Sequence, residues 1–148
     1  MNLYLFLLDS RAPKENTCCT ASSKRRITYM RPAILSIARE RLVSPLRNAV
    51  LAHAGYGVIP ATSFETALKI LKRRHVCALV IGQSMELRER RALCSEAKKR
   101  GIPTMVMDPY GHPTDGGCEL HVTPLDGPEM LLDALASLIR RRHLACFA

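Results

Sequence analysis

The sequence contains no tryptophan, and aromatic side chains make up only 5% of its 148 residues. A hydrophobic core must therefore be built from aliphatic side chains. These are plentiful, because hydrophobic residues account for 47% of the chain and charged residues for 24%. This composition is ordinary for a globular protein, and the length is that of one domain with a core of its own.

The sequence also lacks the patterns that identify several common classes of protein. No G-x-G-x-x-G follows the first predicted strand, and no G-x-x-x-x-G-K-[ST] loop occurs, so the usual nucleotide-binding sites are excluded. The apolar run LYLFLL near the N-terminus is too short to span a membrane, and no basic segment precedes it as in a signal peptide. We therefore expect no membrane partner.

The cysteines and histidines form no recognisable disulfide framework or metal site. The six cysteines are Cys18, Cys19, Cys77, Cys94, Cys118 and Cys146. Their spacing favours reduced thiols and a cytoplasmic location. Cys118-x-x-His121 and His143-x-x-Cys146 resemble halves of zinc sites but lack the standard separation. No catalytic partner is evident for the loop residues His112 and Asp115, so we predict no metal, no cofactor and no enzyme activity.

Short apolar segments alternate with amphipathic ones from residue 33 onward, which predicts a parallel sheet with helical crossovers. The predicted strands are 33–37, 56–61, 76–81, 102–107 and 119–122. Pro60 indicates that the second strand lies at an edge of the sheet. The segment 108–117, DPYGHPTDGG, is too rich in proline and glycine to form a helix.

Capping residues predict where the helices begin and end. Ser44, followed by Pro45, is expected to cap the first helix, whose buried face would include Leu46 and Leu51. Ser63 is expected to cap the second helix. Gly55 and Gly101 follow the first and third helices, where glycine commonly ends a helix.

Several segments, in the right order, resemble the receiver domain of bacterial response regulators. They are AGYGVIPATSFETALKILKRR, CALVIGQSM, IPTMVM and HVTPLDGPEMLLDAL, and the resemblance covers about residues 33–139. It implies a doubly wound, flavodoxin-like α/β fold whose five parallel strands have the order 2-1-3-4-5. The Pro/Gly loop at 108–117 would replace the fourth helix of the family. The resemblance also suggests a cis bond before Pro124.

The positions that carry phosphoryl transfer in that family are altered here. The acidic pair that holds magnesium maps to Ala38 and Arg39, and the phosphoacceptor aspartate maps to Gln83. The hydroxyl residue after the fourth strand maps to Asp108, and the conserved lysine maps to Thr123. The resemblance therefore implies a pseudo-receiver in two-component signalling. It would act without phosphorylation and bind another signalling protein through the surface left by the missing helix.

Basic residues account for the formal net charge of +9 and form three clusters, at 72–75, 98–100 and 140–143. Each cluster is expected near a helix C-terminus, where cations interact favourably with the helix dipole. This explanation suffices for a solvated surface, so nucleic-acid binding is the alternative interpretation. A continuous basic stripe in the folded protein would favour that alternative.

We expect three regions: an N-terminal extension at 1–31, a receiver-like domain at 32–142 and a short tail at 143–148. The extension lacks periodicity, and it is either disordered or precedes the natural start at Met30.

Deleting residues 1–29 should therefore leave the melting temperature nearly unchanged, as measured by thermal unfolding. A drop of several degrees, equivalent to about 1 kcal/mol for a domain of this size, would show that the segment packs against the domain.

Overall fold

The computed structural model describes residues 31–108 and 120–146. Five parallel strands form one sheet in the order β2-β1-β3-β4-β5, as predicted. The strands are β1 (Ala33–Ile37), β2 (Gly57–Ala61), β3 (Ala78–Ile81), β4 (Thr104–Met107) and β5 (Leu120–Val122). The helices are α1 (Val43–His53), α2 (Phe64–Arg73), α3 (Leu87–Lys99) and α4 (Gly127–Cys146), with a short 3-10 turn η1 (Pro124–Asp126) before α4.

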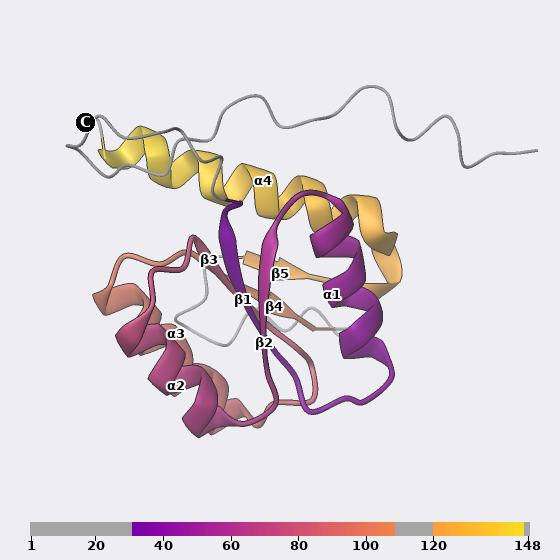
Figure 1. Cartoon of the computed structure of the whole chain (residues 1–148), viewed down its shortest axis with the longest axis horizontal. Coiled ribbons are helices and arrows are strands. Elements are labelled where there is room, and N and C mark those ends of the chain that lie inside the picture. The colour runs from indigo at the N-terminus through magenta and orange to yellow at the C-terminus, as the bar shows by residue number, and fades with distance from the viewer. Residues whose placement is uncertain (1–30, 109–119, 147–148) are drawn as a thin grey trace, which may run out of the picture.

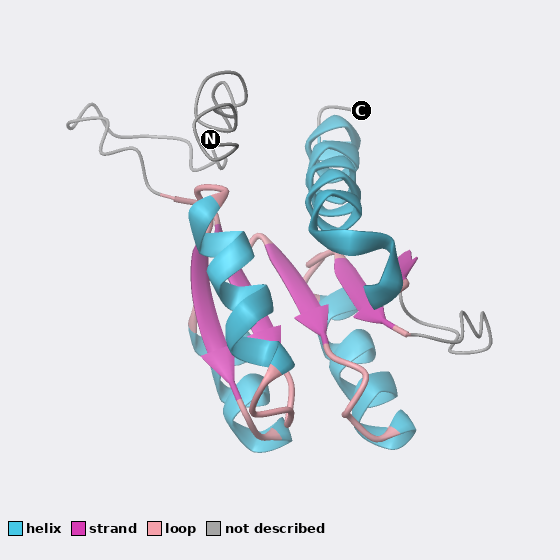
Figure 2. Ribbon diagram, turned by 90° about the vertical axis from the view of Figure 1, so that its right-hand side faces the viewer, coloured by secondary structure: helices cyan, strands magenta, loops and turns pink. Residues whose placement is uncertain are grey.

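The helices cover both faces of the sheet (Figure 1). α2 and α3 lie on one face, and α1 and α4 lie on the other. Each face has its own apolar core, because alternate residues of a strand point to opposite sides of the sheet. Leu35, Ile37 and Leu79 belong to the core beneath α2 and α3, whereas Ile34 and Val80 belong to the core beneath α1 and α4. The strands point the same way (Figure 2), so their carboxyl ends meet at one edge.

Local signals in the sequence account for several boundaries. The Ser63 hydroxyl accepts a hydrogen bond of 3.2 Å from the Thr66 amide and so caps α2. Gly55 and Gly101 follow α1 and α3 with φ angles of 99° and 63°, which glycine adopts without steric cost. Pro60 lies in β2, an edge strand, as predicted.

The prediction for α1 was wrong in two respects. The helix begins at Val43 rather than after a Ser44 cap, and its N-cap is Leu42, which makes no capping side-chain bond. Leu46 was expected to be buried but is 69% exposed, whereas Arg47 is buried beside Leu51. Hydrophobic periodicity could not predict this orientation, because the helix buries a charged residue.

Two features near the C-terminus differ from expectation: the peptide bond before Pro124 and the end of the final helix. No peptide bond in residues 31–108 or 120–146 is cis, so the predicted cis bond before Pro124 is absent. The final helix continues beyond Arg142 to Cys146. β5 follows β4 with no helix described between them, as expected if the fourth helix of the family is missing. The predicted loop itself, apart from Asp108, lies outside the described residues.

The expectation of reduced thiols fails at Cys94, which is disulfide-bonded. Sequence spacing did not reveal this disulfide, since folding brings distant positions together. Cys77 remains reduced and half-buried. Within the described ranges, no helix is long and apolar enough to cross a membrane.

Candidate functional site

The candidate site lies at the carboxyl edge of the sheet, where open α/β folds usually bind ligands. Ala38 directly follows β1, Gly82 and Gln83 follow β3, and Asp108 follows β4. These strands are adjacent in the sheet, so the fold brings four of the predicted positions, Ala38, Arg39, Gln83 and Asp108, to one edge. Thr123 follows β5, the outermost strand on that side, and precedes η1.

The ends of β1 and β3 approach each other closely. Ile37 is paired with Ile81, and the Gly82 amide donates a hydrogen bond of 2.7 Å to the Ile37 carbonyl. A Cβ atom on Gly82 would lie 2.7 Å from the Ala38 Cβ and 3.2 Å from the Ile37 oxygen. Gly82 therefore faces the buried Ala38, whereas the next residue, Gln83, is exposed. Neither Gly82 nor Gln83 offers a carboxylate.

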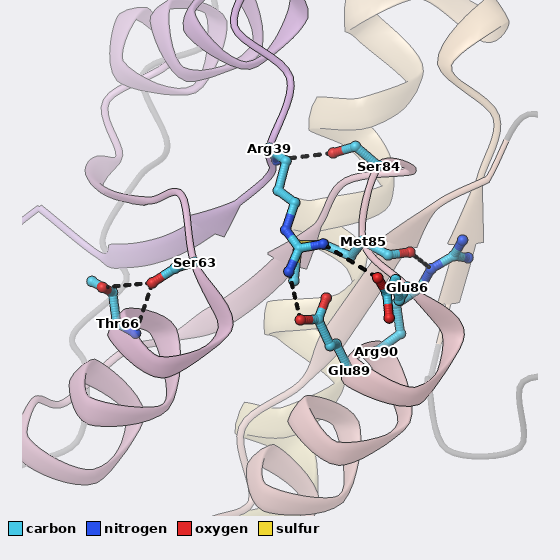
Figure 3. A network of polar contacts seen from close by, with 8 residues as sticks. All are labelled: Arg39, Ser63, Thr66, Ser84, Met85, Glu86, Glu89 and Arg90. Carbon is cyan, nitrogen blue, oxygen red and sulfur yellow. Dashed lines mark hydrogen bonds and ion pairs between the residues drawn. The ribbon is translucent and has the colours of Figure 1, made fainter.

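Arg39 is the centre of a set of polar contacts beside this close approach (Figure 3). Its backbone amide donates a 2.9 Å hydrogen bond to the Ser84 hydroxyl. One terminal nitrogen of its guanidinium lies 2.6 Å from a Glu89 carboxylate oxygen, and the other lies 3.7 Å from Glu86. These contacts join the segment after β1 to the loop and first turn that follow β3. Arg39 therefore lies at this edge together with the two carboxylates that pair with it, those of Glu86 and Glu89.

Arg90 extends this network toward β4. Its Nε donates a 2.8 Å hydrogen bond to the Met85 carbonyl, and a terminal nitrogen lies 3.9 Å from the Asp108 carboxylate. The Asp108 side chain is only 9% exposed, so the nearby guanidinium helps to offset the cost of burying its charge. We call Arg39, Glu86, Glu89, Arg90 and Asp108 the arginine–carboxylate network.

A second arginine, Arg47, lies behind the network and is almost fully buried. Its guanidinium donates to the Ser36 hydroxyl at 2.9 and 3.3 Å and to the Ile37 carbonyl at 3.5 Å. Burial lowers the pKa of this guanidinium below its ordinary value, and the charge of Glu40 opposes that shift. A terminal nitrogen of Arg47 lies 3.0 Å from the position of a Gly82 Cβ. Arg47 thus fills space on the α1 side of the sheet.

These contacts show what the site can do chemically. Magnesium needs several hard oxygen ligands, and a guanidinium nearby repels the ion. In residues 31–108 and 120–146, no group of three or more histidine, cysteine, aspartate or glutamate side chains is placed to hold a metal. The arrangement instead offers carboxylates already paired with arginines. The exposed pair of Arg39 and Glu86 contributes only about 0–1 kcal/mol to stability, so its main effect is on local charge.

Several residues of this site were not predicted from the sequence. Glu86 and Glu89 lie in a highly charged helical segment, where nothing in the pattern distinguishes them from solvent-exposed residues. Arg47 was missed because it falls among apolar positions of α1. Gly82 offered a signal, since a glycine directly after a buried strand often marks a close backbone approach. The loop residues His112, Asp115 and Cys118 lie outside the described residues, and His121 is half-buried in β5.

Replacing Gly82 with alanine should destabilise the protein by about 1–3 kcal/mol, because the new methyl group forces β1 and β3 apart at Ala38. Urea unfolding would measure the change. Gly57→Ala is the matched control, since its Cβ would meet no heavy atom closer than 3.6 Å, and it should change stability by less than about 0.5 kcal/mol. Equal effects of the two substitutions would contradict this account of Gly82.

The fold and site can now be compared with known proteins. No family model matches the sequence, and no curated protein matches it. Solved structures do match. A CheY-like response regulator receiver domain protein from Methanospirillum hungatei is 15% identical, with a TM-score of 0.69, over 78% of this chain and 98% of that one. The chemotaxis protein CheY4 of Vibrio cholerae is 17% identical, with a TM-score of 0.65, over 73% and 98% of the two chains.

A third similar structure contains a metal. It is the receiver domain of a sensor histidine kinase from Pseudomonas aeruginosa, with a magnesium ion coordinated in its active site cleft. It is 15% identical, with a TM-score of 0.64, over 74% of this chain and 98% of that one. This chain therefore has the fold of response regulator receiver domains.

Proposed function

We propose that this protein is a signalling module with a receiver-like fold that binds another protein without being phosphorylated. The observation that carries the proposal is the arginine–carboxylate network. At the carboxyl edge of the sheet, Arg39 lies 2.6 Å from Glu89, and no carboxylate projects from Ala38, Gly82 or Gln83. Phosphoryl transfer to a protein needs a nucleophile and charge stabilisation by a metal or cations.

The absence of the nucleophile does not depend on how β3 is aligned with other receiver domains. Gly82 faces Ala38, and Gln83 is the next residue along the chain. Glycine has no side chain, and the glutamine amide cannot form an acyl phosphate. The proposal therefore holds whether Gly82 or Gln83 corresponds to the phosphoacceptor position.

A protein-binding role is supported by apolar side chains exposed at the same edge. They are Leu42, Val43, Leu46, Leu87, Leu125 and Met130, which we call the apolar set. Each lies at the beginning of α1, α3 or α4, or in η1 just before α4. In a parallel sheet with helical crossovers these beginnings adjoin the carboxyl ends of the strands. Leu42 and Leu125 are the most exposed of the set, at 83% and 84%.

Incubating the protein with acetyl phosphate and magnesium should add no phosphate, because both the metal ligands and the acceptor carboxylate are missing. Intact mass spectrometry measures the adduct, with a conventional receiver domain as the positive control. The Gln83→Asp variant should also remain unmodified, because Arg39 still occupies the place of a metal ligand. A stoichiometric adduct on the unaltered protein that is stable to acid and labile to base would overturn the proposal.

Introducing charge into the apolar set should prevent partner binding without unfolding the protein. We expect the Leu42→Glu/Leu46→Glu variant to lose the partner that copurifies with the unaltered protein in affinity capture from its host. Leu144→Glu is the control, because Leu144 is 73% exposed near the end of α4, away from the apolar set. Thermal unfolding checks that both variants are folded. Retention of the partner by the double variant would contradict the assignment of this surface.

A further inference from the structure

The opposite edge of the sheet, where the strands begin, carries nine of the 22 lysine and arginine residues of the chain. We define the basic rim as nine residues: Lys72, Arg73, Arg74, Lys98, Lys99, Arg100, Arg140, Arg141 and Arg142. All but the half-buried Arg142 are exposed. The first two groups of three lie at the ends of α2 and α3, and the third lies in the C-terminal half of α4.

Contacts in the structure join the three groups into one surface. Glu96 accepts a 2.8 Å hydrogen bond from Arg100. This bond lowers the pKa of Glu96 below its usual value, and the charges of Lys72 and Lys99 act in the same direction. α2 and α3 pack against each other, so the groups at their ends are neighbours (Figure 1). The Arg142 guanidinium lies 3.7 Å from the position of a Cβ on Gly101, directly after the α3 group. The groups therefore follow one another from α2 through α3 to α4.

The charge of this surface is large compared with that of the rest of the chain. The nine cations and Glu96 together carry a net charge of +8, out of a formal net charge of +9 for all 148 residues. The remaining residues are therefore almost neutral as a whole. Repulsion among neighbouring cations destabilises a folded protein, and an anionic ligand would relieve it.

The helix dipole does not account for the whole rim. Lys72, Arg73, Lys98 and Lys99 lie in the last turns of α2 and α3, where a cation is favourable. α4, however, continues to Cys146, and the basic residue in its last turn is His143. Since the dipole effect falls off within one turn, it cannot explain the group at 140–142.

We propose that the basic rim binds the phosphate backbone of a double-stranded nucleic acid, without reading its sequence. Six of its nine cations are arginines, whose planar guanidinium pairs with phosphate through two hydrogen bonds. Single-strand binding normally uses exposed aromatic platforms. In the described residues the aromatic side chains are Tyr56 and Phe64, and both are half-buried. The rim therefore offers charge but no stacking surface.

The surroundings of the rim favour a nucleic acid over a membrane surface. Peripheral membrane binding combines basic residues with apolar side chains that enter the lipid. The exposed large apolar residues of the described chain lie at the opposite edge, with Leu144 as the exception. This surface is distinct from the apolar set, so the proposal stands independently of the one for protein binding.

The test is a fluorescence anisotropy titration of the full chain with labelled duplex and single-stranded oligonucleotides of several sequences. We expect a Kd of roughly 1–100 µM for duplex near about 150 mM salt, with little dependence on sequence and a steep dependence on salt. Each lost phosphate contact lowers the slope of log Kd against log salt by about 0.9. The Arg140→Gln/Arg141→Gln variant should therefore lower that slope by about 2.

The matched control is Arg88→Gln/Arg91→Gln, which removes the same charge from the exposed first half of α3, away from the rim. It should leave the slope and the affinity nearly unchanged, and circular dichroism checks that both variants are folded. Equal losses in the two variants, no binding of duplex to the unaltered protein, or tighter binding to vesicles containing phosphatidylserine would each overturn the proposal.

Discussion

The close approach of β1 and β3 at their carboxyl ends determines the chemistry of the whole edge. Gly82 lies so near Ala38 and the Ile37 carbonyl that no side chain can be added there without moving a strand. The space is occupied from the α1 side by Arg47, which is held by Ser36 and Ile37. The charged side chains therefore lie nearer the solvent, where Arg39 forms ion pairs with Glu86 and Glu89. The close approach of Gly82 to Ala38 therefore affects both the packing within the sheet and the position of the ion pairs beside it.

The sequence could predict the parts of the fold that depend on local patterns. The strand order follows from the resemblance to receiver domains. Local residue preferences predict the Ser63 cap, the glycines that end helices and the position of Pro60 in an edge strand. The sequence could not predict the orientation of α1, because the helix buries Arg47 where periodicity expects an apolar residue. It also could not predict the disulfide at Cys94 or the partners of Arg39, which depend on contacts between distant segments.

The two edges of the sheet differ in the kind of interaction they offer. At the carboxyl edge, arginines and carboxylates neutralise one another, and exposed leucines lie at the beginnings of the helices. At the amino edge, cations greatly outnumber carboxylates, and exposed leucine is almost absent. One domain thus separates a surface suited to burial against a protein from one suited to long-range attraction of an anion. The body of the sheet, with β1, β3 and β4 largely buried, lies between these surfaces.

Pro60 has a consequence for how copies of this protein behave toward one another. It lies within β2, whose outer side has no neighbouring strand among the described residues. An unpaired edge strand is a template on which another chain can add a strand, and this is a common route to aggregation. A proline supplies no N–H for such pairing and so interrupts the ladder at its position. On the β2 side, the sheet is therefore poorly suited to growth by addition of a strand.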